Sequence, residues 1–403
     1  MTRRVCSKMF TDINVKFPYD GLKNCCKSND YVISDAELAS LEERGQNVLT
    51  HNAEYLRRKT DMVENNVLPH RGCDTCIQAE PNSLFRTWNI WQAGRLPANQ
   101  QMLYGDNFRT YEFVLSSACD LKCVYCSDKD SSSWAKELGV PVRKGSAEWK
   151  AKILSALMDH LRHKTFDPAE SYWFFFSGGE PTYNPETLQL IEEIIKIVPN
   201  PSIIISTNGN TKSSVMQRYI DTVRQYSRVQ WRFHCSVDGV GERAEAIRTG
   251  LVWSRFVENV TRLLHEPNVI VRICPTVNLY SVPHMYEYVT YFHGLLASHG
   301  QTHADMIDLN MVQEPELSPW SMPDIYRDGL DAAIDYCDQH GLDFAAHLRN
   351  VRNLIGTRID ENTAERIQRK WDYFKLHRPQ YDWDTLFPHV DDIVQDLDKR
   401  FSK

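Results

Sequence analysis

The stretch SSACDLKCVYCSD, residues 116–128, places three cysteines directly after the apolar run YEFVL. Its thiols belong to Cys119, Cys123 and Cys126, and no fourth cysteine lies nearby. Three thiolates with this spacing can hold three irons of a 4Fe-4S cubane and leave the fourth iron open for a substrate or cofactor. A zinc site would want a fourth close ligand, and only Asp120 or Asp128 is placed for that role. The spacing therefore favours an incompletely ligated iron–sulfur cluster.

From about residue 104, apolar runs alternate with amphipathic stretches. We predict six strands, over residues 111–116, 171–178, 202–209, 229–239, 269–278 and 306–312. We predict five intervening helices, over residues 146–164, 185–198, 213–226, 253–266 and 282–300. Near-continuous apolar strands between helices are typical of a parallel sheet, which stays open or closes toward a barrel. The sequence thus predicts an α/β fold built from repeated βα units.

The distinctive polar and glycine-rich groups all follow predicted strands. The first strand ends in the three cysteines, and the next four end in SGGEPT (177–182), STNGN (206–210), SVDGVGE (236–242) and TVN (276–278). In parallel α/β folds the chemistry gathers at the carboxyl ends of the strands. We therefore expect these loops to contribute to one site.

The three cysteines, the aromatic Tyr125 before the last of them, and the turn Gly178-Gly179-Glu180-Pro181 together resemble the radical S-adenosylmethionine (SAM) enzymes. The resemblance covers roughly residues 104–312 and implies a partial (βα)6 TIM-like barrel. It implies that SAM binds the open iron, and that an electron from the cluster cleaves the sulfonium bond. The resulting 5′-deoxyadenosyl radical would take a hydrogen atom from a substrate. An electron donor such as flavodoxin or ferredoxin is implied as a partner.

The same resemblance implies a set of contacts to SAM. Arg248 and Ser236 match a serine–arginine pair that holds the SAM carboxylate and ribose in SPASM-type relatives, while a surface ion pair is the alternative for Arg248. Tyr125 would lie near adenine, with simple packing as its alternative. The implied cofactor-binding residues are Tyr125, Gly178, Gly179, Glu180, Pro181, Ser206, Thr207, Asn208, Ser236, Arg248, Thr276 and Asn278.

A second group of cysteines lies in the first fifth of the chain. The stretch CSKMFTDINVKFPYDGLKNCC (6–26) followed by GCDTC (72–76) resembles the opening of twitch-domain radical SAM proteins. It implies an auxiliary 4Fe-4S cluster held by Cys6, one of Cys25 or Cys26, Cys73 and Cys76. The related SPASM spacing after glycine selects Cys26, whereas the usual choice of the first cysteine of a pair selects Cys25. A structural zinc site is the alternative, because four thiolates with a Cys-x2-Cys pair also suit zinc.

Three regions are predicted: an N-terminal cysteine-rich module (1–103), the radical SAM partial barrel (104–312) and a helical C-terminal extension (313–403). In the first region we expect one long helix, which opens at a capping box from Ser34 to Glu37 and runs to about residue 66. In the last region we expect a helix that begins at Ser321 and ends at Gly341.

Composition narrows the class of protein further. The 403 residues include 46 basic and 53 acidic ones, and a net charge of -7 disfavours a nucleic-acid polymer as the main partner. No apolar run is long enough to cross a bilayer, and the first residues lack a secretory signal, which predicts a cytoplasmic protein without a membrane partner. Eleven cysteines in a reducing compartment argue against a disulfide framework. Cys235, Cys274 and Cys337 are isolated and are expected to be small buried hydrophobes.

The sequence therefore predicts a radical SAM enzyme with an auxiliary cluster. A peptide or protein substrate is favoured, and a small metabolite, sugar or nucleotide is the alternative, because a fold does not fix its substrate. Two hypotheses from other classes are a noncatalytic electron-transfer protein and a zinc-organised binding protein. The first does not need GGEP beside an incompletely ligated cluster, and the second does not explain the three barrel cysteines.

Overall fold

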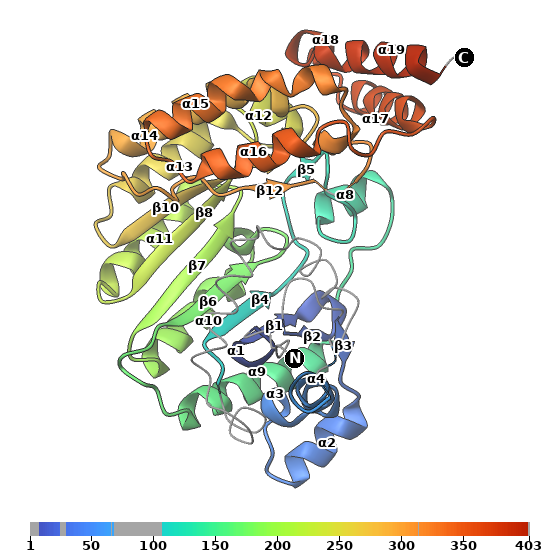
Figure 1. Ribbon diagram of the computed structural model, residues 1–403. Coiled ribbons are helices and arrows are strands. Elements are labelled where there is room, and N and C mark those ends of the chain that lie inside the picture. Colours follow the sequence, from blue (N-terminus) through green and yellow to red (C-terminus); the bar gives the residue numbers. More distant parts are fainter. Residues whose placement is uncertain (1–7, 25–29, 66, 68–106, 313, 402–403) are drawn as a thin grey trace. The chain divides into compact units, whose positions relative to one another are not determined.

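The computed structural model describes residues 8–24, 30–65, 67, 107–312 and 314–401 (Figure 1). The chain forms two compact units, and each is described by itself. Unit 1 comprises the described residues of Met1–Ala118, Val142–Ile205 and Arg228–Gln230. Unit 2 comprises those of Cys119–Pro141, Ser206–Ser227 and Trp231–Lys403. The five N-terminal cysteines Cys6, Cys25, Cys26, Cys73 and Cys76 lie outside the described residues.

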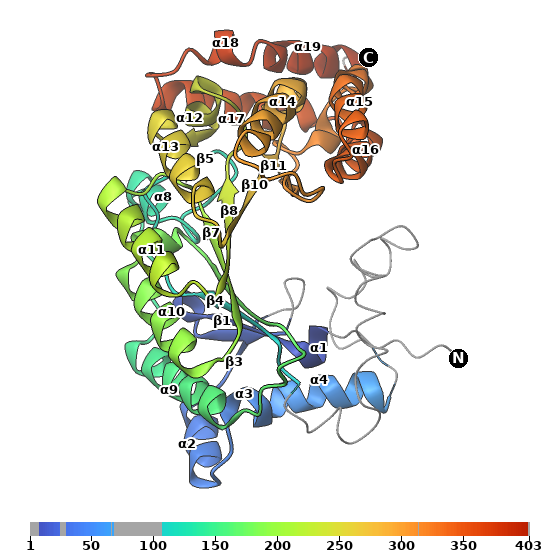
Figure 2. The same cartoon turned by 90° about the vertical axis from the view of Figure 1, so that its left-hand side faces the viewer.

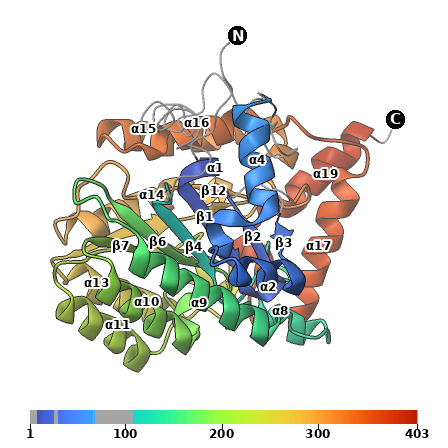
Figure 3. The same ribbon diagram turned by 90° about the horizontal axis from the view of Figure 1, so that it is seen from below.

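A twisted sheet forms the centre of unit 1, and its strands follow one another in the order β7, β6, β4, β1, β2, β3 (Figure 3). Neighbouring strands from β7 to β1 pair in parallel, whereas β2 and β3 are added antiparallel. The strand bounds are β1 (Asp12–Lys16), β2 (Gly21–Lys23), β3 (Tyr31–Val32), β4 (Thr110–Val114), β6 (Tyr172–Ser177) and β7 (Pro201–Thr207). The predicted strands that begin at residues 111, 171 and 202 are thus confirmed, while three N-terminal strands join the sheet beside them.

Alternating burial fixes which face of these strands meets the helices. The ring of Tyr111 on β4 stacks on that of Phe174 on β6 at 4.9 Å between centroids, and both are fully buried. Tyr111 Oη lies 2.9 Å from a ring nitrogen of His160 in helix α9 (Ala147–His163). Helix α10 (Pro185–Ile197) lies on the same side of these strands as α9 (Figure 2). Both helices were predicted, because aromatic and β-branched strands need a covering apolar helix face.

The long helix predicted after Ser34 is wrong in its extent. Its start is confirmed, because the Ser34 hydroxyl accepts a hydrogen bond from the Glu37 backbone N–H at 3.2 Å. Gly45, with φ of +62°, interrupts the helix, a conformation that residues with a side chain rarely adopt. Asn47 and Asn52 then cap two new helices. The N-terminal helical elements are α1 (Lys8–Thr11), the 3-10 turn η1 (Phe17–Tyr19), α2 (Asp35–Glu43), α3 (Val48–His51) and α4 (Ala53–Val63).

Unit 2 contains three pairs of strands. The parallel pair of β8 (Gln230–Ser236) and β10 (Val269–Cys274) confirms two predicted strands. The strand predicted over 306–312 is reduced to β12 (Asn310–Met311), which pairs in parallel with β11 (Thr276–Val277). The third pair is antiparallel and joins β5 (Lys122–Cys123) to β9 (Arg248–Thr249).

The helices of unit 2 include the three that were predicted from residues 213, 253 and 282. The helix predicted to begin at Ser321 instead starts at Asp331, after a series of 3-10 turns, and its end at Gly341 is confirmed by φ of +65° there. The helical elements are α8 (Ser132–Glu137), α11 (Ser213–Gln225), α12 (Glu242–Ile247), α13 (Trp253–Leu264), η3 (Val282–His284), α14 (Met285–Ala297), η4 (Pro319–Ser321), η5 (Asp324–Tyr326), η6 (Asp328–Leu330), α15 (Asp331–Gln339), α16 (Phe344–Leu354), α17 (Thr363–His377), α18 (Trp383–Leu386) and α19 (His389–Phe401).

Aromatic packing joins the C-terminal helices to the loop that follows β11. The fully buried ring of Tyr280 lies 5.9 Å from Trp371 of α17 and 5.2 Å from Phe387. Such pairs add to the free energy gained by burying their apolar area. The isolated Cys235, Cys274 and Cys337 are buried, as predicted. None of the helices in the described part of the chain has the length and apolar character needed to traverse a bilayer.

Candidate active site

The three cysteines lie at the start of unit 2, on the segment between β4 and α8. A tight turn brings the last two together in the chain, since the Cys126 backbone N–H donates to the Cys123 carbonyl at 3.0 Å. Cys123 is also paired with Arg248 across the β5–β9 ladder. The indole N–H of Trp134 donates to the Cys123 carbonyl at 2.8 Å. The backbone of the cysteine segment is therefore anchored by two neighbouring elements.

Each sulfur has a different environment. Cys123 is buried and its sulfur lies 3.9 Å from Nη1 of Arg248, whereas Cys119 and Cys126 are half-buried. Burial raises the pKa of the Cys123 thiol, and it raises the pKa of Cys126 to about 12. No three His, Cys, Asp or Glu side chains in the described residues converge closely enough to hold a metal ion. Three thiols on one anchored segment fit a cubane as a donor set, because a bound metal ion stabilises thiolates that burial disfavours.

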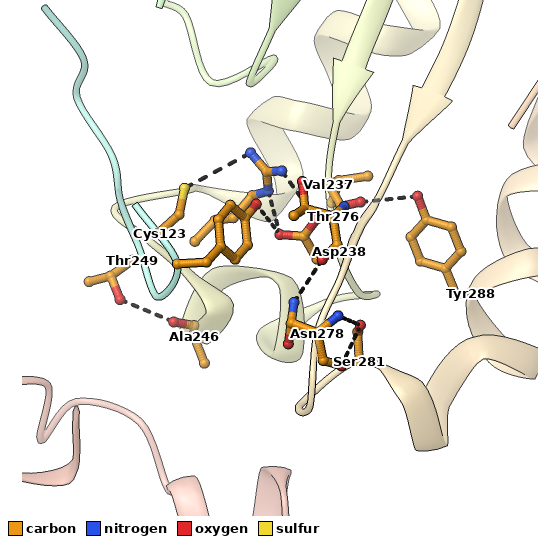
Figure 4. A network of polar contacts seen from close by, with 11 residues as sticks. Cys123, Val237, Asp238, Ala246, Thr249, Thr276, Asn278, Ser281 and Tyr288 are labelled. Atoms are coloured by element: carbon orange, nitrogen blue, oxygen red, sulfur yellow. Dashed lines mark hydrogen bonds and ion pairs between the residues drawn. The ribbon is translucent and has the colours of Figure 1, made fainter. Parts of the chain in front are cut away.

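Asp238, two residues after the end of β8, is the centre of a buried hydrogen-bond network in unit 2 (Figure 4). Its Oδ2 accepts hydrogen bonds from the Tyr125 hydroxyl at 2.6 Å and from Nε of Arg248 at 2.7 Å. Its Oδ1 accepts from Nη2 of Arg248 at 3.1 Å and from the backbone N–H of Thr276 at 2.7 Å. Four donors satisfy a carboxylate that has no access to solvent, as burial of a charge requires.

The hydrogen-bond network around Asp238 explains how Arg248 stays charged although it is buried. The side chain is 7% exposed and forms a two-point ion pair with Asp238, so the surface ion pair considered as its alternative is not what the structure contains. Burial alone lowers the pKa of Arg248, but the adjacent Asp238 carboxylate outweighs burial and raises this pKa above its ordinary value. The guanidinium is therefore a fixed positive charge beside Cys123 and Tyr125.

A second polar group supports the segment around Cys119. Asp120 accepts hydrogen bonds from the side-chain amides of Asn208 at 2.9 Å and Asn210 at 2.7 Å. The amide nitrogen of Asn208 also lies 4.0 Å from the sulfur of Cys119. Asp120 therefore ties the loop after β7 to the cysteine segment, and its carboxylate is already occupied by two amides.

The remaining predicted residues of unit 2 lie at the ends of strands. Thr207 is buried and its hydroxyl accepts from the Gly209 backbone N–H at 3.1 Å, while Ser206 is half-buried. Ser236 is half-buried at the end of β8. Asn278 is fully buried, and its side chain binds the Thr276 carbonyl and the Tyr280 N–H at 2.8 and 2.9 Å. The amide of Asn278 thus stabilises the turn after β11.

A pocket of about 430 Å³ opens within unit 2 beside the cysteine segment. Tyr125 and Thr276, which both contact Asp238, form part of its wall. The pocket is large enough for a small-molecule ligand. Its lining residues are Tyr125, Thr276, Met311, Val312, Glu314 and Pro315.

The glycine turn lies in unit 1, where it packs against the end of β4. A Cβ atom at Gly179 would approach the Ala118 carbonyl oxygen to 2.4 Å, and Gly178 has φ of +115°. The Gly179 and Glu180 backbone N–H groups donate to the Ser116 and Ala118 carbonyls at 3.1 and 2.7 Å. Only glycine fits this close approach. The turn therefore fixes the residues that directly precede Cys119 in the chain.

Glu180 and Pro181 form the start of a 3-10 turn, η2 (Pro181–Tyr183). The buried Glu180 carboxylate accepts from the backbone N–H and the hydroxyl of Thr182 at 2.9 and 2.6 Å. The expected contact of Gly178–Pro181 with SAM stays a prediction.

Sequence reasoning missed Asp238, whose carboxylate accepts four hydrogen bonds, and it missed Asn210. Asp238 stands in SVDG, next to the predicted Ser236, so its position at a strand end was visible. Nothing in the sequence indicated that its partners would be Tyr125 and Arg248, which are 113 and 10 residues away.

Comparison with known proteins agrees with the predicted class. Residues 113–274 match the sequence family described as the Radical SAM superfamily. The chain therefore contains a radical SAM superfamily domain, within an α/β fold whose central sheet is mainly parallel.

One similar solved structure is a histidine-tagged form of "anSMEcpe with bound AdoMet". The two chains are 17% identical, with a TM-score of 0.39, over 56% of this chain and 59% of that one. Similarity at this level carries no argument about function. No curated protein matches this sequence.

Proposed function

We propose that this chain is a radical SAM enzyme that binds SAM at a 4Fe-4S cluster held by Cys119, Cys123 and Cys126. The observation that carries the proposal is the match of residues 113–274 to the Radical SAM superfamily, a range that contains all three cysteines. When bound, the cluster and SAM supply one-electron cleavage of the sulfonium bond and hydrogen abstraction from a substrate. The residues of this chain bind and orient them.

Two features of unit 2 support a cofactor role. The guanidinium of Arg248 is a fixed buried cation 3.9 Å from the Cys123 sulfur, and Asp238 holds it in place. A guanidinium with this support suits a carboxylate-bearing ligand such as SAM. The pocket lined by Tyr125 and Thr276 lies beside the same network and is proposed to take the adenosine part of SAM.

The finer parts of the proposal concern the auxiliary cluster and the substrate. We propose a second 4Fe-4S cluster on the N-terminal cysteines, by resemblance to twitch-domain proteins, and an electron donor such as flavodoxin or ferredoxin. A peptide or protein substrate is favoured, with a small metabolite as the alternative. The cysteines of the proposed auxiliary site lie outside the described residues, so metal analysis tests the auxiliary cluster.

Anaerobic reconstitution with iron and sulfide tests the proposal. The reduced wild-type protein should form 5′-deoxyadenosine from SAM, measured by liquid chromatography and mass spectrometry. Replacement of Cys119, Cys123 and Cys126 by Ala should abolish this product.

A matched control replaces Cys235, Cys274 and Cys337 by Ala, which removes three buried thiols without touching the cysteine segment. This control should retain iron and product. An iron-loaded, reduced wild type that yields no 5′-deoxyadenosine would favour an electron-transfer protein, and a protein that binds only zinc would favour a binding module.

A further inference from the structure

Arg378, at the end of helix α17, is a fully buried arginine whose hydrogen bonds are not satisfied. Its exposed fraction is 0%, and Nε, Nη1 and Nη2 have no hydrogen-bond partner among the described residues. The carboxylate of Glu137 approaches Nη2 to 3.8 Å, beyond hydrogen-bond distance. Glu137 already accepts from the Tyr373 hydroxyl at 2.8 Å and pairs with Lys122. Glu137 is therefore the ion-pair partner of Arg378, but it is shared with Tyr373 and Lys122 and leaves the N–H groups of the guanidinium unsatisfied.

Aromatic side chains hold this guanidinium in place. It lies 4.8 Å from the ring centre of Trp134 and 4.6 Å from that of Phe374. Cation–π contacts of this kind fix an arginine but do not satisfy its N–H groups. Trp134 is the same residue whose indole N–H donates to the Cys123 carbonyl. One indole ring thus touches both Arg378 and the backbone of a predicted cluster ligand.

The charge of Arg378 acts on the cysteine segment. Arginine keeps its proton in proteins, although burial lowers the pKa of Arg378. Its guanidinium and the Cys123 carbonyl both contact the indole of Trp134, so this charge lies close to the cysteine segment. A buried cation that shares its one carboxylate with Lys122 is only partly compensated, so a further anion nearby would stabilise it. A cubane with three thiolate ligands is such an anion, and it becomes more negative on reduction.

We propose that Arg378 is a positioning residue for the radical SAM cluster: its buried charge stabilises the reduced, more negative state and makes helix α17 part of the cluster site. This inference rests on the proposed function, because it requires a cluster on Cys119, Cys123 and Cys126. It also assigns the C-terminal helices a role in the redox chemistry. Charge and hydrogen bonding around a cluster are the means by which proteins set its potential.

The test is the variant Arg378→Met, which keeps the length of the side chain and removes the charge. In the reconstituted protein, the midpoint potential of this cluster, followed by EPR spectroscopy, should shift to more negative values. A roughly tenfold loss in the equilibrium constant for one-electron reduction, about 59 mV, is the expected size. Arg378→Lys should keep the potential near that of the wild type. The Cys73→Ala/Cys76→Ala background removes signals from an N-terminal cluster.

Thermal unfolding supplies a second test, because the change in stability should have opposite signs in the metal-free and the loaded protein. Arg378→Met should stabilise the metal-free protein, because it removes a buried charge that Glu137 compensates only in part, and it should destabilise the loaded protein. A merely structural arginine would destabilise both forms. Glu137→Gln removes the carboxylate that partly compensates Arg378, and it should shift the potential in the opposite direction, to more positive values.

Arg358→Met is the matched control, since Arg358 stacks on Trp320 at 4.2 Å and is exposed. It should change neither the potential nor the difference in stability between the two forms. An unchanged potential in Arg378→Met overturns the inference while leaving the proposed function intact. A wild type that acquires no cluster on the three cysteines overturns the proposed function itself.

Discussion

The carboxylate of Asp238 and the guanidinium of Arg248 form a two-point ion pair with Nε–Oδ2 and Nη2–Oδ1 distances of 2.7 and 3.1 Å. Both side chains are buried, and Asp238 is 0% exposed. Asp238 follows β8, and Arg248, 10 residues later, begins β9, which pairs with β5 in the cysteine segment. The ion pair therefore holds the end of β8 close to the cysteine segment. This relationship makes Asp238 as important to the site as the residues predicted from the sequence.

Replacing Asp238 by Asn should destabilise the protein strongly. The change leaves the Arg248 charge buried without its counterion, which typically lowers the free energy of unfolding by about 3–5 kcal/mol. Urea denaturation measures this loss. Asp384→Asn, which breaks the exposed pair with Lys375, should leave stability nearly unchanged. Equal effects of the two substitutions would show that the buried pair has no special role.

Removing both charges should separate folding from cofactor binding. In the double variant Asp238→Leu/Arg248→Met, apolar side chains replace the buried pair, a change that proteins often tolerate. We expect iron loading to be retained and SAM affinity to fall roughly ten- to hundred-fold, because a charge-assisted hydrogen bond contributes about 1.5–3 kcal/mol. Equilibrium dialysis with labelled SAM measures the affinity. Undiminished binding would reduce Arg248 to a structural residue.

Gly179→Ala should disturb the turn after β6. The added Cβ would lie 2.4 Å from the Ala118 carbonyl oxygen and 2.7 Å from the Ser117 carbonyl carbon, both of them backbone atoms that cannot rotate away. Overpacking of this kind costs about 1–3 kcal/mol in the free energy of unfolding. Gly294→Ala is the control, because a Cβ there meets nothing within 4 Å, and it should stabilise helix α14 by about 0.5–1 kcal/mol. Gly179→Ala should thus lower the melting temperature, whereas Gly294→Ala should raise it.

The N-terminal cysteines should bind a cluster independently of Cys119, Cys123 and Cys126. Cys73→Ala/Cys76→Ala should remove about four of roughly eight irons but leave slow SAM cleavage, because the proposed SAM site is elsewhere. Single substitutions at Cys25 and Cys26 should identify the true ligand by its loss of iron. Metal analysis of the Cys119, Cys123 and Cys126 triple Ala variant is decisive. One zinc per chain and no iron would make the N-terminal site a structural zinc site.

Acid should destabilise the protein through buried histidines. Burial lowers the pKa of His389 to about 4 and that of His284 to about 3, and the two rings lie 5.7 Å apart. The unfolded chain binds a proton below pH 6.5 while the folded chain does not, so stability falls as the pH decreases from about 6.5 to 4. For His389 the full loss is about 3 kcal/mol.

Denaturation at pH 7.5 and pH 4.5 measures this effect. His389→Gln can still donate to the Leu279 carbonyl, which lies 3.1 Å from the histidine ring nitrogen, and should reduce the difference between the two pH values. His163→Gln, at an exposed histidine, should leave the difference as it is in the wild type. A pH dependence that persists undiminished in His389→Gln would assign it to other groups.

Local pattern predicted the repeated strands and helices well. Residues 171–178 are apolar and aromatic and became β6, and Asn184 with Pro185 marks the start of α10. Local rules failed where long-range pairing or backbone conformation decides. The strand predicted at 306–312 pairs over only two residues, and the turns η4 to η6 replace the helical start expected at Ser321. Three N-terminal strands were missed, because β1 pairs with the distant β4, which begins at Thr110, and β2 and β3 join the sheet through β1.

In the candidate site, too, local features were predicted better than long-range contacts. Spacing alone made Cys119, Cys123 and Cys126 candidate cluster ligands, since metal ligands are often close in the chain, and this assignment stays a prediction. The roles of Asp238 and Arg378 depend on tertiary contacts, which no short motif encodes. Asp238 accepts a hydrogen bond from a tyrosine 113 residues away, and Arg378 lies over the aromatic ring of Trp134. Side chains that compensate charge were therefore the least predictable part of the site.

The parallel pairing of β1 with β4 has a consequence for how the chain folds. Asn14 and Glu112 face each other in the register and their side chains are hydrogen-bonded, yet 98 residues separate them in the sequence. During synthesis, β1 and β2 leave the ribosome seconds before β4 does, at typical rates of about 5–20 residues per second. Throughout that interval one edge of β1 exposes unpaired backbone groups, which invite association with other chains. Nascent unit 1 is thus a natural client for chaperones, and coexpression with them should increase the yield of folded protein.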